Sequence, residues 1–295
     1  MEKKKILVTG GAGYIGSHTI IELLADPSLE IISCDNFSKS TVKTFERIQK
    51  ITNKKVLNYE LDLCDLKETE KMFEREKNIY GIVHFAALKS APASVTEPEL
   101  YHHNNITSIN TILACCAKYK VDQFIFSSSC AVYGNIEKLP ANEQTPFGIA
   151  QSPYAETKLI SENILKEFAK INTGINCVAL RYFNPVGAHS SGLIGEIQFP
   201  KESLVPVITA TAIGKLKEVV ISGNDHPTRD GTCIRDYVHV CDIAEAHVKA
   251  LKFLEQKVSA KNYFVFNLGS GKGVSVKEAI DAFEKVSIRT WPEHF

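Results

Sequence analysis

Leu7-Val8-Thr9-Gly10-Gly11-Ala12-Gly13-Tyr14-Ile15-Gly16 joins an apolar strand to a glycine-rich turn, and a helical pattern follows from Tyr14 to Leu24. Glycine suits such a turn because the backbone has to bend tightly and approach a pyrophosphate closely. The helix N-terminus then offers free N–H groups and a positive dipole end to the phosphates. The glycines stand at 10, 13 and 16, a Gly-x-x-Gly-x-x-Gly spacing rather than Gly-x-Gly-x-x-Gly. By itself this pattern also suits a purely structural turn.

One carboxylate strengthens the dinucleotide interpretation. Asp35 ends the next apolar run, Ile31-Ile32-Ser33-Cys34, about 20 residues beyond the turn, where an acidic side chain binds the ribose hydroxyls of NAD. The alternative is a structural turn followed by an exposed Asp. Because both features are present, the sequence favours a dinucleotide site with NAD as cofactor.

Bulk composition narrows the class of protein. The 295 residues suffice for one large α/β domain or for a domain with a smaller lobe. Lys plus Arg and Asp plus Glu both number 34, so the charge balance indicates neither a nucleic-acid nor a membrane partner, and no apolar run is long enough to span a bilayer. The start lacks a signal-peptide core and the eight cysteines lack metal-type spacing, so we expect a cytoplasmic protein with reduced thiols and no metal.

Short apolar runs alternate with amphipathic segments as far as Leu180. This alternation predicts an α/β fold, a doubly wound parallel Rossmann sheet with right-handed crossovers. We expect strands over 5–8, 30–34, 55–59, 81–85, 123–127, 176–180 and 219–221, and helices over 14–25, 66–76, 97–118, 153–171, 203–214 and 241–254. From Asn184, glycine and proline interrupt the pattern. We therefore expect an NAD-binding domain over 1–183 and a smaller substrate lobe over 184–295. Parts of the second segment can return to the first domain.

The segment Ser152-Pro153-Tyr154-Ala155-Glu156-Thr157-Lys158 has the residue types of a helix start, with Ser as N-cap and Pro at the first helical position. Tyr154 and Lys158 then lie on one helical face. A nearby ammonium and a nicotinamide cation both favour the phenolate, so the pair suits a general base near neutral pH. Tyr-x-x-x-Lys is also common on ordinary helices.

Three consecutive hydroxyls, Ser127-Ser128-Ser129, follow the apolar run Gln123-Phe124-Ile125-Phe126. Ligands of open α/β sheets bind at the carboxyl ends of strands, where the Ser129 hydroxyl can bond the reacting oxygen and relay its proton. A polar strand end without function is the alternative. The order of glycine turn, Asp35, serine triplet and Tyr-x-x-x-Lys is what favours catalysis.

Longer strings of the sequence resemble the extended short-chain dehydrogenase/reductase family, and in particular its nucleotide-sugar epimerases. The resemblance covers roughly residues 5 to 286. The strings that carry it are Val8–His18, Val83–Lys89, Phe126–Ser129 with Val132–Gly134, Arg181–His189, Gly223–Asp225, Arg235–Val240 and Asn267–Gly271.

The resemblance implies interconversion of UDP-glucose and UDP-galactose by oxidation and re-reduction at the sugar C4, with NAD as a bound cofactor. Tyr154, Lys158 and Ser129 would be catalytic, and Asn184, Leu204 and Arg235 would meet the UDP-sugar. Cofactor-binding residues would be Gly10, Gly13, Tyr14, Ile15, Gly16, Asp35, Asn36, Asp62, Leu63, Phe85, Ala86, Ala87, Lys89, Asn104 and Phe183. A guanidinium also suits phosphate on its own chemistry, although Arg235 has an alternative partner in Asp236. A homodimer through the helices over 97–118 and 153–171 is implied by the resemblance alone.

Two segments depart from the family pattern. The family's Asn-Asn-Leu appears here as Glu202-Ser203-Leu204, and the stretch from Ser287 to Phe295 resembles none of the family's closing segments. We therefore expect part of the sugar-nucleotide pocket to be missing and the lobe after about Asn184 to be sensitive to protease. Two alternatives follow, a non-catalytic NAD-binding homologue and another nucleotide-sugar oxidoreductase. Related dehydratases carry Asp-Glu after the hydroxyl residue, whereas Cys130-Ala131 stand here, which favours simple oxidation and hydride return.

Overall fold

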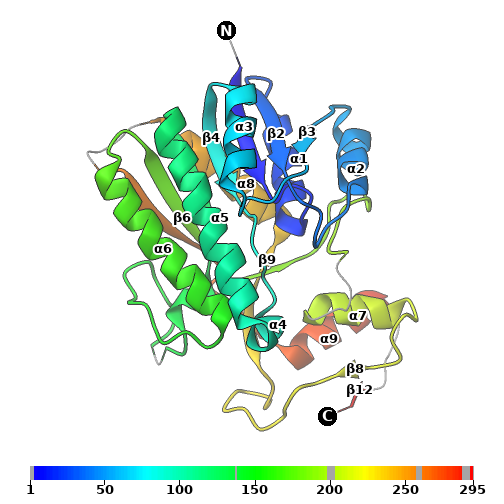
Figure 1. The fold of residues 1–295 in the computed structure, drawn as a ribbon. Coiled ribbons are helices and arrows are strands. Elements are labelled where there is room, and N and C mark those ends of the chain that lie inside the picture. Colours follow the sequence, from blue (N-terminus) through cyan, green and yellow to red (C-terminus); the bar gives the residue numbers. More distant parts are fainter. Residues whose placement is uncertain (1–2, 137, 198–202, 257–260, 288–292, 295) are drawn as a thin grey trace.

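A seven-stranded parallel sheet forms the centre of the computed structural model, which describes residues 3–136, 138–197, 203–256, 261–287 and 293–294 (Figure 1). The strand order is β10-β6-β5-β4-β1-β2-β3. The strands are β1 Lys4–Thr9, β2 Leu29–Cys34, β3 Leu57–Tyr59, β4 Ile79–His84, β5 Gln123–Ser129, β6 Asn176–Tyr182 and β10 Tyr263–Leu268. The predicted Rossmann-type sheet is confirmed.

Strand β1 lies between β2 and β4, with Leu7 in register with Ile32 on one side and Ile82 on the other. The chain runs outward from β1 through β2 and β3, and then returns to build β4, β5 and β6 on the opposite side. The direction reverses between β1 and β4, and open α/β sheets bind ligands in the crevice at the carboxyl ends of the strands beside such a point.

Helices cover both faces of the sheet, which explains why its strands are apolar throughout. One apolar core joins the sheet to α3, α5 and α6, and a second joins it to α1, α2 and α8. Their bounds are α1 Tyr14–Leu24, α2 Lys43–Thr52, α3 Leu66–Glu76, α5 Pro98–Tyr119, α6 Pro153–Ile171 and α8 Val240–Glu255. The short α4, Ala91–Thr96, follows β4.

The start of α6 forms as its sequence predicts. The Ser152 hydroxyl accepts a hydrogen bond from the Ala155 N–H at 3.2 Å, and Pro153 is the first helical residue. The helix begins and ends at the predicted residues, Pro153 and Ile171. These N-cap contacts fix where the helical face with Tyr154 begins.

The chain crosses back to the sheet after leaving it. Helix α8 packs against α1, and β10 pairs in parallel with β6, so that Phe264 lies opposite Val178. The division into 1–183 and 184–295 is therefore a proposal about function, since residues of α8 and β10 complete the first unit structurally.

A small lobe lies below the sheet in Figure 1 and contains α7 Leu204–Ala212, β8 Val219–Val220, α9 Val276–Ser287 and β12 Glu293–His294. Its core consists of Ile208, Val219, Ile221 and Ile280. A three-stranded sheet, β11-β9-β7, joins this lobe to the main sheet through β7 Asn184–Val186, β9 Ile234–His239 and β11 Gly273–Ser275. The sequence patterns did not predict α2, α4, β7, β9, β10, β11 or α9. Most of the residues from Ser287 to Phe295, namely 288–292 and 295, lie outside the described residues.

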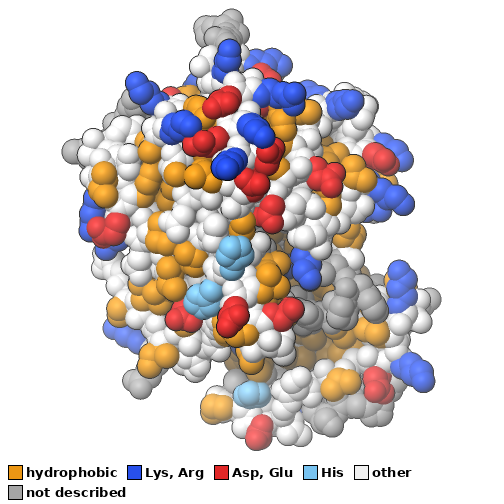
Figure 2. Space-filling view, in the orientation of Figure 1, with side chains coloured by type: hydrophobic (Ala, Val, Ile, Leu, Met, Phe, Trp, Pro, Cys, Tyr) orange, Lys and Arg blue, Asp and Glu red, His pale blue; other side chains and the backbone are white. Residues whose placement is uncertain are grey.

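Charged side chains of both signs are interspersed over the face seen in Figure 2, as the balanced composition leads one to expect. All eight cysteines are free thiols. Within the described residues, none of the helices has the length and apolar character required to cross a membrane.

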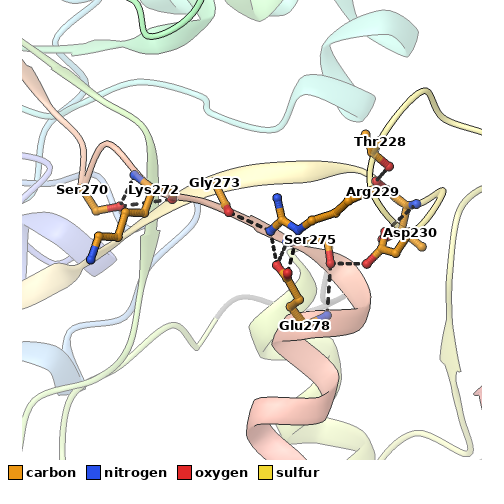
Figure 3. A network of polar contacts seen from close by, with 9 residues as sticks. Thr228, Arg229, Asp230, Ser270, Lys272, Gly273, Ser275 and Glu278 are labelled. Carbon is orange, nitrogen blue, oxygen red and sulfur yellow. Dashed lines mark hydrogen bonds and ion pairs between the residues drawn. The ribbon is translucent and has the colours of Figure 1, made fainter.

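A polar network fixes α9 to the loop that precedes β9 (Figure 3). Ser275 and Glu278 cap the helix reciprocally, because the Glu278 N–H donates to Ser275 Oγ at 3.1 Å and the Ser275 N–H donates to Glu278 Oε2 at 2.8 Å. Arg229 binds the Glu278 carboxylate with two nitrogens and the Gly273 carbonyl at 2.9 Å. Ser275 also donates to Asp230.

Ser275→Ala should loosen this lobe without disturbing the main sheet. The substitution removes the cap of α9 and the bond to Asp230, and the loss of an N-cap of this kind costs about 1 kcal/mol. Hydrogen exchange should become faster in α9 and β11 and stay unchanged in β1, β4 and β5. Asp281→Ala on the exposed side of α9 is the control, and equal exchange in both variants would contradict the capping role.

Candidate active site

The glycine turn after β1 lies very close to the backbone of the segment that follows β4. Gly10 has a φ of +68°, and a Cβ there would lie 2.8 Å from the Ala86 nitrogen. A Cβ on Gly16 would lie 2.3 Å from the Gly10 carbonyl oxygen. Gly13 is the N-cap of α1 and provides no side chain to cap its first amides. The turn therefore leaves the helix N-terminus open toward the crevice, and this cradle is suited to a dinucleotide pyrophosphate.

Asp35 lies at the end of β2, where the ribose-binding carboxylate was expected, and it is buried rather than exposed. Its Oδ2 accepts from the Ala12 N–H at 2.9 Å, so that it binds the glycine turn directly. Its Oδ1 accepts from the Phe37 N–H at 2.9 Å and the Ser40 hydroxyl at 2.8 Å. A carboxylate offers about four acceptor positions, which leaves capacity for a ribose hydroxyl. The structure excludes the alternative of an exposed Asp.

Further residues that the family resemblance assigns to cofactor binding lie at the same end of the sheet. Asn36 follows Asp35 directly and its Oδ1 accepts from the Ser38 N–H at 3.1 Å. Asp62, beyond β3, accepts from the Cys64 N–H at 2.8 Å, and Leu63 is buried in the core. Ile15 packs against the second core from the first turn of α1. Their contacts to a nucleotide remain proposals.

The second side of the crevice follows β4, where Phe85, Ala86, Ala87 and Lys89 lie. Asn105 of α5 fixes this segment, since its amide donates to the Leu88 carbonyl at 3.0 Å and accepts from the Leu88 N–H at 2.8 Å. Asn105 also donates to Thr157 of α6 at 3.0 Å, and the Asn104 amide donates to Asn105 at 2.9 Å. The sequence motifs pointed to Asn104 and not to Asn105, although two adjacent amides on one helix were a readable signal.

The serine triplet and the helical face of α6 meet at the end of β5. The Lys158 ammonium donates to the Ser127 carbonyl at 2.7 Å and lies 5.9 Å from the centroid of the Tyr154 ring. Ser129 follows at the last position of β5, and its hydroxyl adjoins Tyr154 closely enough to lower the phenol pKa. Tyr154, Lys158 and Ser129 therefore come together, as the sequence predicted.

Burial determines the pKa values of Tyr154 and Lys158 in this structure. Burial raises the pKa of Tyr154 to about 12, because Ser129 offsets only part of that effect. Burial likewise lowers the pKa of Lys158 to about 8, against the influence of Glu162. That the Lys158 ammonium and a nicotinamide cation together favour the phenolate stays a prediction. Positive charge near the phenol is what would oppose its desolvation and let it act as a base.

A buried ion pair that sequence analysis missed supports the catalytic face. Glu162 lies one turn beyond Lys158 on α6 and binds Arg181 of β6 through two contacts, at 2.8 and 2.7 Å. Ser128 donates to the same carboxylate, and Arg181 donates to the Tyr133 hydroxyl at 2.8 Å. Tyr154, Lys158 and Glu162 continue one helical face at intervals of four, which was a readable signal.

Arg235 lies on β9 and is exposed. Burial raises the pKa of the Cys130 thiol, which directly follows Ser129, to about 11, and the Arg235 cation opposes part of that effect. Asp236 is not its partner, because the Asp236 carboxylate accepts from the Ser270 N–H and hydroxyl at 2.8 and 2.6 Å and from the Gly271 N–H at 2.9 Å. Arg235 itself donates to the Ile234 carbonyl at 2.8 Å.

The remaining predicted residues divide between two places. Phe183 and Asn184 follow β6, where the Phe183 N–H donates to the Leu268 carbonyl at 3.2 Å and the Asn184 amide donates to the Asp236 carbonyl at 3.0 Å. They therefore lie between the catalytic edge and β9. Leu204 begins α7 and packs on the lobe core. Glu202 lies outside the described residues.

The cradle, the acidic residue and the Tyr–Lys–Ser cluster define a nucleotide-dependent enzyme of the epimerase and dehydratase class. The chain belongs to the NAD dependent epimerase/dehydratase family, which it matches over residues 6–269.

Within that family the chain is similar to proteins named UDP-glucose 4-epimerase. The protein of that name from Bacillus subtilis is 45% identical over 292 residues, covering 98% of this chain and 84% of the relative. The Schizosaccharomyces pombe relative uge1 is 44% identical, with 97% and 81% coverage. The crystal structure of the Bifidobacterium longum UDP-glucose 4-epimerase in complex with NAD+ and UDP superposes with a TM-score of 0.92 at 42% identity, covering 99% of this chain and 85% of that one.

His84 should make the protein sensitive to acid. Burial and the Lys158 cation lower its pKa from 6.5 to about 3, and its Nδ1 is hydrogen-bonded to the Thr9 hydroxyl at 2.9 Å. The unfolded chain therefore binds the proton first, so the stability due to neutral His84 is complete above about pH 6.5 and declines toward pH 3. Unfolding free energies of the wild type and His84→Gln, measured between about pH 7 and about pH 4, should fall less steeply in the variant. Parallel pH slopes would contradict this assignment.

Proposed function

We propose that this chain interconverts UDP-glucose and UDP-galactose by oxidation and re-reduction at the sugar C4. The observation that carries the proposal is the meeting of Tyr154, Ser129 and Lys158 at the end of β5, beside the dinucleotide cradle. The relatives named UDP-glucose 4-epimerase, and the solved structures described with NAD, support the substrate and the cofactor.

When bound, NAD supplies a hydride acceptor that returns the hydride in the second half of the reaction. Tyr154 takes the proton from the sugar 4-hydroxyl, with the Ser129 hydroxyl as relay. Because the pKa of Tyr154 is about 12 in this structure, the phenol depends on positive charge in the adjoining cradle and on Lys158 to act near neutral pH. The same groups return the proton when the hydride comes back on the other face of the sugar.

The surroundings favour epimerisation over elimination. Elimination of water needs a second acid or base beside the hydroxyl residue, whereas Cys130 and Ala131 follow Ser129. Burial raises the pKa of Cys130 to about 11, so that it stays a thiol at neutral pH. No proton acceptor is thus available at that position.

Substrate contacts are proposed for three residues. The Arg235 guanidinium suits the diphosphate. Asn184 is bonded to the carbonyl of Asp236, the residue that follows Arg235 on β9, and is proposed to contact the diphosphate as well. Leu204 at the start of α7 is the contact proposed for uracil. A homodimer through α5 and α6 and a cytoplasmic location are further proposals that rest on the family resemblance.

The direct test is the conversion of UDP-galactose to UDP-glucose by the purified chain without added NAD. Epimerisation returns the cofactor to its starting state, so turnover should proceed with no net NADH. Net NADH formation would instead indicate a one-way oxidoreductase. Bound NAD without turnover and without UDP binding in calorimetry would indicate a non-catalytic NAD-binding protein.

Tyr154→Phe should keep the fold and the bound NAD but lose most turnover. The ring still packs against its neighbours and only the titrating hydroxyl is lost, a change that costs about 100- to 10,000-fold for a general acid–base group. Initial rates with UDP-galactose, together with NAD content, provide the measurement. A rate within about threefold of wild type would exclude Tyr154 as the base.

Asp35→Ala should weaken NAD binding and reduce discrimination against NADP. A carboxylate accepts bonds from the ribose hydroxyls and repels a 2′-phosphate. The variant also frees the Ala12 N–H, so the turn loses one of its fixed contacts. Titration of cofactor-stripped protein with both dinucleotides tests this, and Asp26→Ala in the exposed turn before β2 is the control. Equal ratios of NAD to NADP affinity in the wild type and Asp35→Ala would refute the assignment.

A further inference from the structure

The segment from Gly187 to Ile197 connects the two sides of the cofactor crevice. Tyr14 lies on the side formed by β1 and α1, and its hydroxyl donates to the Gly187 carbonyl at 2.6 Å. Lys89 lies on the opposite side, beyond β4, and its ammonium binds Glu196 Oε1 at 2.8 Å. One short segment therefore holds a residue from each side of the switch point.

The segment has a fixed shape of its own. Ala188 and Gly195 form an antiparallel bridge, and the His189 N–H donates to the Ile194 carbonyl at 2.9 Å. The Ile194 side chain is buried in the core beneath. These contacts place Gly187 and Glu196 at the two ends of a closed loop.

The base of the segment is held from β9. Gly187 has a φ of +94°, and a Cβ there would lie 2.3 Å from His239 Nε2. Because β7 pairs with β9 at Val186 and His239, the base of the loop is joined to the strand that carries Arg235.

The two contacts, Tyr14 with Gly187 and Lys89 with Glu196, lie close together at the Tyr14 ring. The Lys89 ammonium lies 5.7 Å from the centroid of the Tyr14 ring. Burial and the Glu196 carboxylate raise the pKa of Tyr14 well above its usual value, so the hydroxyl remains a donor to Gly187. The Glu196 side chain is 14% exposed and that of Lys89 is 48% exposed, so solvent screens the ion pair mainly from the Lys89 side.

We propose that Glu196 is a positioning residue that, through Lys89, holds the segment 187–197 across the crevice and slows release of the bound dinucleotide. This inference rests on the proposed function for the identity of the cofactor. Closure of the crevice then requires two contacts, Tyr14 with Gly187 and Lys89 with Glu196, and the dinucleotide leaves after both have opened.

The test measures cofactor release rather than turnover. The full chain, loaded with NAD, is diluted into buffer containing an NAD-degrading enzyme, and the remaining bound NAD is followed with time. Glu196→Gln should release NAD about two- to tenfold faster, as expected for the loss of one partly buried charged contact. Glu245→Gln is the matched control, because it removes an exposed Lys–Glu ion pair on α8 and should leave the release rate unchanged.

A double variant shows whether Glu196 acts through Lys89. Lys89→Met alone should also speed release, and Glu196→Gln should add no further increase in the Lys89→Met background. A release rate of Glu196→Gln equal to that of the wild type, or full additivity of the two changes, would overturn the inference. Tyr14→Phe, which removes the other tie, should speed release by a similar factor. A wild-type chain that binds no NAD at all would refute the proposed function and this inference together.

Discussion

The close approach of β1 and β4 at Gly10 is the constraint on which the site depends. The space for a Cβ at Gly10 is already occupied by the backbone of Ala86, and Thr9 joins the strands by binding both the Ala86 N–H at 3.3 Å and the His84 ring. This crossing sets the direction of α1 on one side and of the segment with Lys89 on the other. Asp35, bonded to Ala12, fixes the same turn from β2. A binding cradle thus results from strand packing, before any ligand contact is made.

Burial governs the electrostatics of the catalytic cluster. A hydroxyl, an ammonium and a carboxylate lie on one face of α6, yet only the carboxylate has a buried counter-ion, Arg181. The pair Glu162–Arg181 is nearly inaccessible, and loss of one partner would leave a buried charge uncompensated. Tyr154 and Lys158 are held with raised and lowered pKa, respectively, each opposed to its charged form. At neutral pH the phenol is therefore protonated, while Lys158 still carries most of its positive charge.

The sequence predicted those helices and turns that are marked by a local signal, such as an N-cap residue or a glycine-rich turn. Helices α3 and α6 begin at the expected residues because Asp65 and Ser152 cap them, and Asp35 stands where the turn chemistry required it. Strand β10 was missed although Tyr263-Phe264-Val265-Phe266 is an apolar run typical of a buried strand, because it lies beyond the region in which strands and helices alternate and its pairing with β6 joins residues distant in the chain. The burial that raises the pKa of Tyr154 was likewise not readable from the sequence, because the whole fold creates it. Glu162 and Asn105 were overlooked although their spacing offered a signal, because most polar residues on helices are exposed and the partners of these two, on β6 and beyond β4, are distant in the chain.

The return of β10 to the edge of the sheet has a consequence for biosynthesis. The seven residues of β6 pair with β10, which the ribosome synthesises some eighty residues later. Asn262, just before β10, then donates hydrogen bonds to the carbonyls of Ala169, Asn172 and Ile175. Until that moment a nascent chain presents β6 as an open edge, which is a template for wrong pairing. Chaperone demand during translation should therefore peak between the emergence of β6 and that of β10, and slow codons in that interval would prolong the exposure.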